Sequence, residues 1–239
     1  MNIHRITHNK KAGSCSLYFI GCNFRCRGCY WKQIYGRVDY RAMKFLNLSQ
    51  VIEILKPANP QRVSILSGDP KPNEEFKMLP KVLHDEFGCE VRLLTNGYIL
   101  PDTEGLEHVS ISIKAYTDSI HREYTSKSNR RSLDNIRQLH RNGISLSSSS
   151  VYIPNYIDLD EIERIASFIA SVDENIPYRV IGYCRVAGAP FREATGPEVE
   201  KAADLAKRHL KNVEWAAHSR CDYAGIVDLH INNIRRQDD

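Results

Sequence analysis

The chain has 239 residues, of which 42% are hydrophobic and 26% are charged. That length can bury one substantial core, so we expect a single domain over 1–239, with a core at about 15–215 and a C-terminal tail at 216–239. The formal net charge of +4 is too small to indicate nucleic-acid binding, and no apolar run approaches the roughly 18 to 20 residues that cross a bilayer, so neither class is predicted.

Strand-like and helix-like segments alternate along the chain, which predicts about six β-α units around a parallel sheet. The basic stretch Met1–Lys11 precedes a short apolar run that we interpret as the first strand rather than as a secretory signal. The predicted strands are Leu17–Ile20, Arg62–Leu66, Glu90–Leu94, His108–Ile113, Ile144–Ile153 and Tyr178–Tyr183.

Three helices have boundary signals in the sequence. Asp158 and Glu161 have the spacing of a capping box, which predicts the start of one helix. A second helix runs from Leu133 and is predicted to stop at Gly143, because glycine adopts the left-handed conformation that ends many helices. Pro197 is typical of the first turn of a third helix.

Three cysteines just after the first predicted strand are the most informative feature. Cys22, Cys26 and Cys29, followed by Tyr30, give the pattern C-x3-C-x2-C-aromatic. Three thiolates can hold a [4Fe–4S] cluster and leave one iron without a protein ligand, and that iron can chelate a small molecule. We therefore interpret the three cysteines as cluster ligands.

Other cysteine sites fit the sequence less well. A zinc site requires four Cys or His ligands, and no second ligand pair follows at a suitable spacing. A disulfide framework is disfavoured because the seven cysteines are odd in number. A simple electron-transfer protein would supply a fourth thiolate near the first three. The remaining cysteines are scattered singly and are expected to be buried small hydrophobic residues: Cys15, Cys89, Cys184 and Cys221.

The alternative from another functional class is a zinc-binding interaction or RNA-binding module. Arg130, Arg131, Arg137 and Arg141 would give such a module a basic helix face. Aromatic residues are not interleaved with these arginines, so a solvated helix face explains them equally well and nucleic acid is not the favoured partner.

Polar motifs follow the other predicted strands. Ser67-Gly68-Asp69-Pro70 follows the second strand, Thr95-Asn96-Gly97 the third, and Lys114 the fourth. Ligands of parallel β-α folds bind at the carboxyl ends of the strands, where these motifs and the cysteine loop all lie. Their shared location favours one binding site at that edge.

The cysteine motif, together with Ser112–Asn135 and Val151–Asp158, resembles the pyruvate formate-lyase activating enzyme family of the radical S-adenosylmethionine (SAM) superfamily. The likeness extends over roughly Leu17–Leu210. It implies an α/β fold with parallel strands in a partial (β/α)6 TIM-like barrel. It also implies an oxidoreductase of the EC 1.97.1 class, in which one [4Fe–4S] cluster reductively cleaves SAM to methionine and a 5′-deoxyadenosyl radical that abstracts a hydrogen atom.

The resemblance assigns roles to individual residues. Cys22, Cys26 and Cys29 would bind the cluster. Tyr30 and Ile153 would lie near the SAM adenine. The other expected SAM-binding residues are Ser67, Gly68, Asp69, Pro70, Thr95, Asn96, Ser112, Lys114 and Ser149.

The chain departs from the family pattern at several of these positions. Ser112 replaces an acidic residue, and Ser149 falls where an arginine is expected to contact SAM. Arg179 or Arg185 would supply the missing cation. No catalytic side chain is assigned, although Cys184 is a candidate to face the substrate.

The resemblance also implies partners and a setting. The electron donor would be a flavodoxin or a ferredoxin. The hydrogen donor would be a glycine of a glycyl radical enzyme, with a peptide or a small metabolite left open as alternatives. The unpaired cysteines and an oxygen-sensitive cluster fit anaerobic conditions and a reducing cytoplasm.

Overall fold

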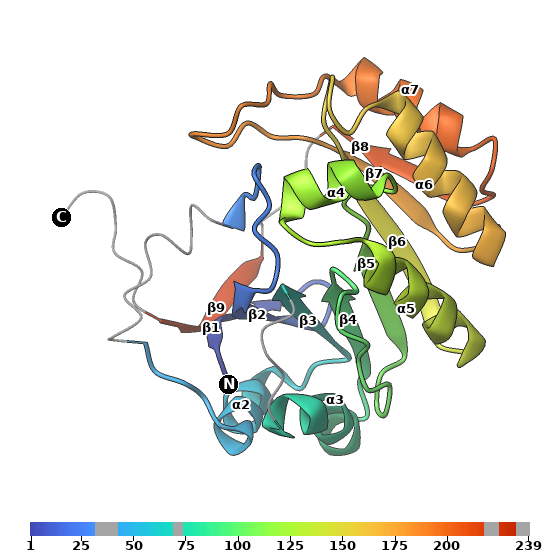
Figure 1. Cartoon of the computed structure of the whole chain (residues 1–239). Helices are drawn as coiled ribbons and strands as arrows, with labels where there is room; N and C mark the ends of the chain where they lie inside the picture. Colours follow the sequence, from blue (N-terminus) through green and yellow to red (C-terminus); the bar gives the residue numbers. More distant parts are fainter. Residues whose placement is uncertain (32–42, 69–73, 218–224, 233–239) are drawn as a thin grey trace.

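A computed structural model of the chain describes residues 1–31, 43–68, 74–217 and 225–232. Asp69, Pro70 and Cys221 lie outside the described residues. The described part contains one nine-stranded sheet with the order β8-β7-β6-β5-β4-β3-β2-β1-β9 (Figure 1).

The sheet is parallel from β2 to β8 and antiparallel at β1 and β9. Its two outer strands, β8 and β9, do not pair with each other in the described part of the chain, so the sheet is an open, partial barrel. The strands are β1 Ile3–Asn9, β2 Ser14–Cys22, β3 Arg62–Gly68, β4 Glu90–Thr95, β5 His108–Ser112, β6 Ser145–Tyr152, β7 Tyr178–Gly182, β8 Val213–Ala216 and β9 Ile226–Ile231.

The predicted α/β partial barrel is confirmed, and the six predicted strands correspond to β2–β7. Three strands were not predicted. Of these, β8 extends the parallel series, whereas β1 lies in the basic N-terminal stretch and pairs with both β2 and β9. The sheet therefore extends beyond 15–215 at both ends. That the whole chain forms a single domain stays a prediction.

The helices pack along the sheet between successive strands (Figure 1). Helix α3 contacts β4, α5 and α6 contact β6, and α7 contacts β7 and β8. The helices are α2 Leu48–Leu55, the 3-10 helix η1 Lys56–Ala58, α3 Glu74–Phe87, α4 Asp118–Thr125, α5 Arg130–Arg141, α6 Leu159–Val172 and α7 Gly196–Ala206.

All three predicted helix boundaries are confirmed. Gly143 follows α5 with a φ of 78°, and Pro197 lies in the first turn of α7. Asp158 does cap α6 and accepts a hydrogen bond from the Leu159 amide. However, Glu161 does not complete a capping box: its carboxylate turns away from the cap to accept hydrogen bonds from Thr117.

The two faces of the sheet differ in chemistry because strand side chains alternate between them. Residues such as Val63 and Val109 are fully buried under the helices. The opposite, concave face has partly exposed polar side chains, most of them serines: Ser64, Ser110, Ser112, Ser147 and Ser149. A polar, open concave face leaves room for a polar ligand at the centre of the barrel.

Candidate active site

The cysteine loop leaves the carboxyl end of β2. Cys22 is the last residue of that strand and pairs with Gly68, the last residue of β3. The backbone of the sequence-predicted Ser-Gly motif therefore lies directly beside the first predicted cluster ligand.

The three thiols differ in accessibility. Cys22 is exposed, Cys29 is half-buried and Cys26 is buried, and none of them forms a disulfide. Within the described residues, no three Cys, His, Asp or Glu side chains lie together in a geometry that holds a metal ion. The loop thus contains three sulfur donors in one short segment, and their joint binding of a cluster stays a prediction.

Nitrogen donors surround the Cys22 sulfur. The Phe24 amide donates to Cys22 Sγ at 3.4 Å, and Asn96 Nδ2 lies 3.7 Å from the same sulfur and 2.8 Å from Asn23 Oδ1. Asn23 Nδ2 is buried and has no hydrogen-bond partner among the described residues. Sulfur ligands with nearby N–H donors are the environment that iron–sulfur clusters use, so the surroundings of the Cys22 sulfur fit such a group.

Helix α4 holds the backbone of the cysteine loop. The Arg25 amide donates to the Thr125 carbonyl at 2.8 Å, and the Arg27 amide donates to the Tyr124 carbonyl at 3.0 Å. Both carbonyls belong to the last turn of α4, where helix carbonyls lack a partner within the helix. The end of α4 therefore fixes the position of the predicted cluster ligands.

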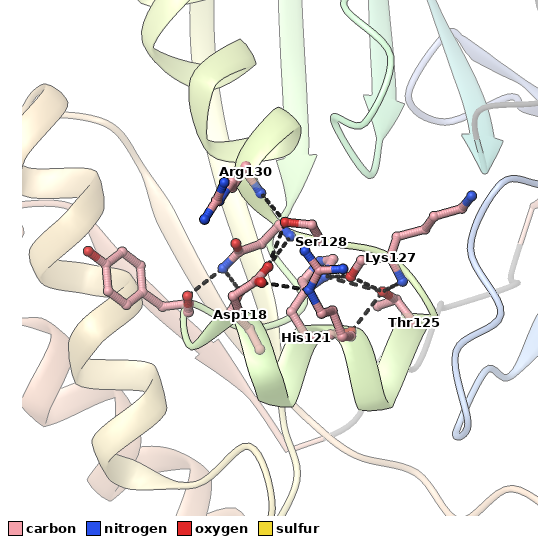
Figure 2. A network of polar contacts seen from close by, with 10 residues as sticks. Asp118, His121, Thr125, Lys127, Ser128 and Arg130 are labelled. Atoms are coloured by element: carbon pink, nitrogen blue, oxygen red, sulfur yellow. Dashed lines mark hydrogen bonds and ion pairs between the residues drawn. The ribbon is translucent and has the colours of Figure 1, made fainter.

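A polar network holds α4 itself (Figure 2). The Asp118 carboxylate accepts hydrogen bonds from Ser128 Oγ at 2.6 Å, from Arg122 Nε at 2.6 Å and from the Asn129 amide at 3.0 Å. The hydrogen bonds from Ser128 and Arg122 lower the pKa of Asp118 to about 2. His121 is buried, and its Nδ1 lies 2.7 Å from the Lys127 carbonyl. The network ties both ends of α4 to the segment that leads into α5.

An aromatic wall packs against the other side of the cysteine loop. It consists of Tyr124, Tyr156, Tyr183 and Phe191, whose neighbouring rings have centroids 4.8 to 6.1 Å apart. A Cβ added to Gly28 would lie 2.8 Å from the Tyr183 ring, so a glycine is required for this close approach.

Arg27 extends over the same wall. Its guanidinium forms an ion pair with Glu123 and lies 5.8 Å from the Tyr156 ring and 5.6 Å from the Phe191 ring. The charge of Arg27 is therefore matched by a carboxylate, and the side chain fastens the loop to the aromatic wall.

A second group of predicted residues gathers on the concave face at β5–β7. Ser112 pairs with Ser149, and Ser149 pairs with Arg179. Lys114 Nζ donates to Ser112 Oγ at 2.7 Å. A lysine and an arginine thus flank the serine at position 149 on the open face of the sheet.

Two helices hold the loops that follow β4 and β5. Asn135 of α5 donates from Nδ2 to the Gly97 carbonyl at 2.8 Å. Glu161 of α6 accepts hydrogen bonds from the Tyr116 and Thr117 amides and from the Thr117 hydroxyl. These contacts position the loops that contain Asn96 and Lys114.

The remaining predicted SAM-binding residues differ in burial and in their contacts. Thr95 is buried and accepts a hydrogen bond from the Gly97 amide at 3.0 Å. Tyr30 is 57% exposed, whereas Ile153 is fully buried and bridges to Ile157. Their contacts with SAM stay predictions, as does a substrate role for the half-buried Cys184.

Cys15 and Cys89 are buried, as predicted. Burial raises the pKa of Cys15 to about 12 and that of Cys89 to about 11, so both thiols stay protonated and behave as packed apolar groups.

Sequence reasoning missed three residues that position the loops: Asn23, Asn135 and Glu161. Asn23 lies inside the cysteine motif, but asparagine is common in loops, so its type alone gave no signal. Asn135 and Glu161 act across about 40 residues of sequence, which no local pattern reveals.

Two clefts in the described part of the chain lie away from the cysteine loop. One of about 470 Å³ is lined by residues of α5 and α6, including Arg137, Glu163 and Phe168. One of about 280 Å³ lies between α3 and the segment after β4. Neither is lined by the predicted cluster ligands. Among the described residues, no helix combines the length and the apolar composition that crossing a membrane requires.

Comparisons with known proteins agree with this geometry. The family model described as the radical SAM superfamily matches residues 17–169, which is more than half of the chain. The chain is 32% identical over 216 residues to "Putative glycyl-radical enzyme activating enzyme MJ1632" of Methanocaldococcus jannaschii, covering 87% of this chain and 82% of that protein.

Solved structures share the fold. SuiB of Streptococcus suis bound to S-adenosylmethionine matches with a TM-score of 0.65 at 14% identity, covering 84% of this chain and 48% of that one, so the chain spans about half the length of SuiB. A domain of pyruvate-formate lyase-activating enzyme from Bacteroides vulgatus matches with a TM-score of 0.51 at 13% identity, covering 59% of this chain and 89% of that one.

The family match spans β2 to α6, the part that contains the cysteine loop and the motifs at the ends of β3, β4 and β5. The chain belongs to the radical SAM superfamily.

Proposed function

We propose that this protein is a glycyl-radical-enzyme activating enzyme, with a [4Fe–4S] cluster on Cys22, Cys26 and Cys29. The observation that supports the proposal most strongly is the pairing of Cys22 with Gly68, which joins the cysteine loop to the next strand-end motif at the carboxyl edge of the sheet. The relative from Methanocaldococcus jannaschii, named as an activating enzyme, supports the same activity.

When bound, the cluster and SAM supply the one-electron chemistry that yields a 5′-deoxyadenosyl radical. The chain's own residues hold and orient these groups. The residues that would contact SAM are Tyr30, Ser67, Gly68, Asp69, Pro70, Thr95, Asn96, Ser112, Lys114, Ser149 and Ile153.

Arg179, the cation beside Ser149, is suited to binding a carboxylate group. Arg179 is the register partner of Ser149 on β7, is exposed on the concave face, and can reach an anionic group placed over Ser112 and Ser149. We propose that Arg179 and Lys114 bind the methionyl carboxylate of SAM. A guanidinium and a carboxylate form a strong, directional pair, which would orient the sulfonium.

A glycine in a backbone loop of a partner protein is the proposed hydrogen donor. The barrel is open between β8 and β9 in the described part of the chain, and its concave face is polar. An extended backbone with its amide groups would fit such a face. The electron would come from a flavodoxin or a ferredoxin.

The test is anaerobic reconstitution with iron and sulfide, followed by dithionite and SAM, with 5′-deoxyadenosine as the measured product. We expect about four iron and four sulfide per chain and product formation that stops when Cys22, Cys26 or Cys29 is changed to alanine. The matched control is Cys89→Ala, because Cys89 is buried away from the loop. This variant should retain the iron and sulfide content and the formation of 5′-deoxyadenosine. Stoichiometric zinc without visible absorption would instead support the zinc-module alternative.

The substrate requires its own test. A glycyl radical enzyme encoded beside this gene, incubated with the reduced protein and SAM, should acquire the doublet electron paramagnetic resonance signal of a glycyl radical. Product formation without that signal, and with a modified peptide or metabolite, would overturn the activating role and keep the radical SAM chemistry.

A further inference from the structure

Tyr183 is a buried tyrosine that the proposed chemistry does not use. It follows β7 directly and is 2% exposed, with its ring in the aromatic wall next to Phe191. The hydroxyl has no hydrogen-bond partner in the described part of the chain. Burial of an unsatisfied hydroxyl is unfavourable, so a phenylalanine would be the more stable choice if the position served packing alone.

The hydroxyl lies directly against the cysteine loop. A Cβ built on Gly28 would be 2.8 Å from Tyr183 Cε2 and 3.0 Å from the hydroxyl oxygen. Gly28 separates Cys26 from Cys29, so the phenol reaches the loop between two of the three predicted ligands.

Electrostatics support this placement. Burial raises the pKa of Tyr183, and the neighbouring Cys184 and Cys29 side chains raise it further, whereas the approaching Val186 amide opposes the shift. The phenol therefore keeps its proton. The hydroxyl lies against Gly28 of the loop, and the next residue in the chain is the predicted ligand Cys29.

We propose that the Tyr183 hydroxyl donates a hydrogen bond to a sulfur atom at the Cys29 side of the bound cluster, either the thiolate or the adjacent sulfide. Reduction makes cluster sulfurs more negative, and a donor stabilises the reduced form more than the oxidised form. Tyr183 is thus a positioning residue that makes the cluster easier to reduce. The inference depends on the proposed function, because it needs a cluster on the cysteine loop.

The experiment compares the cluster reduction midpoints of wild type, Tyr183→Phe and Tyr178→Phe, reconstituted and titrated anaerobically with detection by electron paramagnetic resonance. Tyr178 is the matched control because it is buried on β7, which Tyr183 directly follows, and its hydroxyl also has no hydrogen-bond partner among the described residues, but it lies beside Ser150 rather than the cysteine loop. Iron and sulfide contents must agree among the three proteins.

We expect Tyr183→Phe to have a ratio of reduced to oxidised cluster about threefold to tenfold lower at the wild-type midpoint, a shift of about 28 to 59 mV for a one-electron couple. Tyr178→Phe should have the wild-type midpoint. Electron–nuclear double resonance in D₂O gives a second measurement: the reduced wild-type cluster should lose an exchangeable proton coupling that Tyr183→Phe never has.

Equal midpoints in wild type and Tyr183→Phe, with equal cluster content, would overturn the inference and leave the proposed function standing. The same holds if Tyr178→Phe shifts as much as Tyr183→Phe, since the effect would then reflect general loss of a buried hydroxyl. A wild-type chain that binds no cluster would overturn the proposed function and this inference with it.

Discussion

The amide of Arg25 donates a hydrogen bond to the carbonyl of Thr125 at 2.8 Å across 100 residues of sequence. This bond joins the predicted cluster loop to the last turn of α4. The loop has little secondary structure of its own, so its geometry depends on the stability of that helix end. Changes that loosen α4 should therefore affect cluster binding without touching a cysteine.

Asp118→Asn tests how strongly the polar network around α4 stabilises the fold. The Asp118 carboxylate has a lowered pKa of about 2, held by Ser128 and Arg122, so its ionised form stabilises the fold above its unfolded pKa. That stabilisation is lost as the pH falls from about 4 through about 2. Because the side chain is 36% exposed, we expect the variant to lose only about 1 kcal/mol of unfolding free energy at pH 7.

Urea unfolding at pH 7 and at steps down to pH 2 measures the effect. The difference between wild type and Asp118→Asn should shrink as the pH approaches 2. Asp134→Asn is the control, since this carboxylate is 73% exposed and, among the described residues, forms its ion pair with Arg137 one turn away. A difference that persists unchanged at pH 2 would refute the assignment to the ionised carboxylate.

Gly28→Ala should disturb the contact between the cysteine loop and the aromatic wall. The new Cβ would lie 2.8 Å from the Tyr183 ring and 3.2 Å from the Phe191 ring, so the rings or the loop must move. Overpacking of this kind costs about 1–3 kcal/mol. We expect lower unfolding free energy and less iron per chain after reconstitution.

Gly196→Ala is the matched control for this change. Its added Cβ meets only Ala217 Cβ at 3.9 Å, an ordinary contact at the start of α7. We expect a change within about 0.5 kcal/mol and normal iron content. Wild-type iron content in Gly28→Ala would mean that the wall does not position the loop.

The sequence predicted the parts of this molecule that local patterns encode. Strand-like segments between helix-like ones located β2–β7, and the cysteine spacing located the loop, because both signals lie within short stretches of sequence. It could not predict β1, whose alternation is interrupted by Arg5 and His8 in a basic stretch.

Local sequence patterns could not predict contacts between residues far apart in the chain. Glu161 has the spacing of a capping residue, yet its carboxylate accepts hydrogen bonds from Tyr116 and Thr117, because their amides compete for it once α6 packs beside the loop after β5. The aromatic wall likewise combines residues from three separate segments, and only the folded chain brings Tyr124 and Phe191 together.

Arg179→Gln should weaken SAM binding if Arg179 supplies the cation beside Ser149. Loss of one charged pair to a carboxylate should lower affinity about tenfold, or about 1.4 kcal/mol. Calorimetric titration of the reconstituted protein with SAM measures the change. Arg164→Gln, on the helical side of the sheet, should bind SAM like wild type. Equal affinities for Arg179→Gln and wild type would transfer the role to Lys114 or Arg185.

His4 should make the fold sensitive to mild acid. It is 2% exposed on β1, and burial, together with the charges of Arg5 and His230, lowers its pKa from 6.5 to about 4. The unfolded chain therefore binds more protons between these values, so stability is full above about 6.5 and falls as the pH drops towards 4. The lowered pKa of His4 corresponds to a loss of about 3 kcal/mol of unfolding free energy when the pH falls below about 4.

His4→Gln removes this titration, so its unfolding free energy should fall less than that of wild type between pH 7 and pH 4. The buried His121 and the half-buried His108 and His230 also have lowered pKa values and contribute to the wild-type slope, so the difference between the two proteins is the informative quantity. Parallel pH profiles for wild type and His4→Gln would show that the imidazole is charged, or solvated, in the folded protein, contrary to the packing of β1 against β2 and β9.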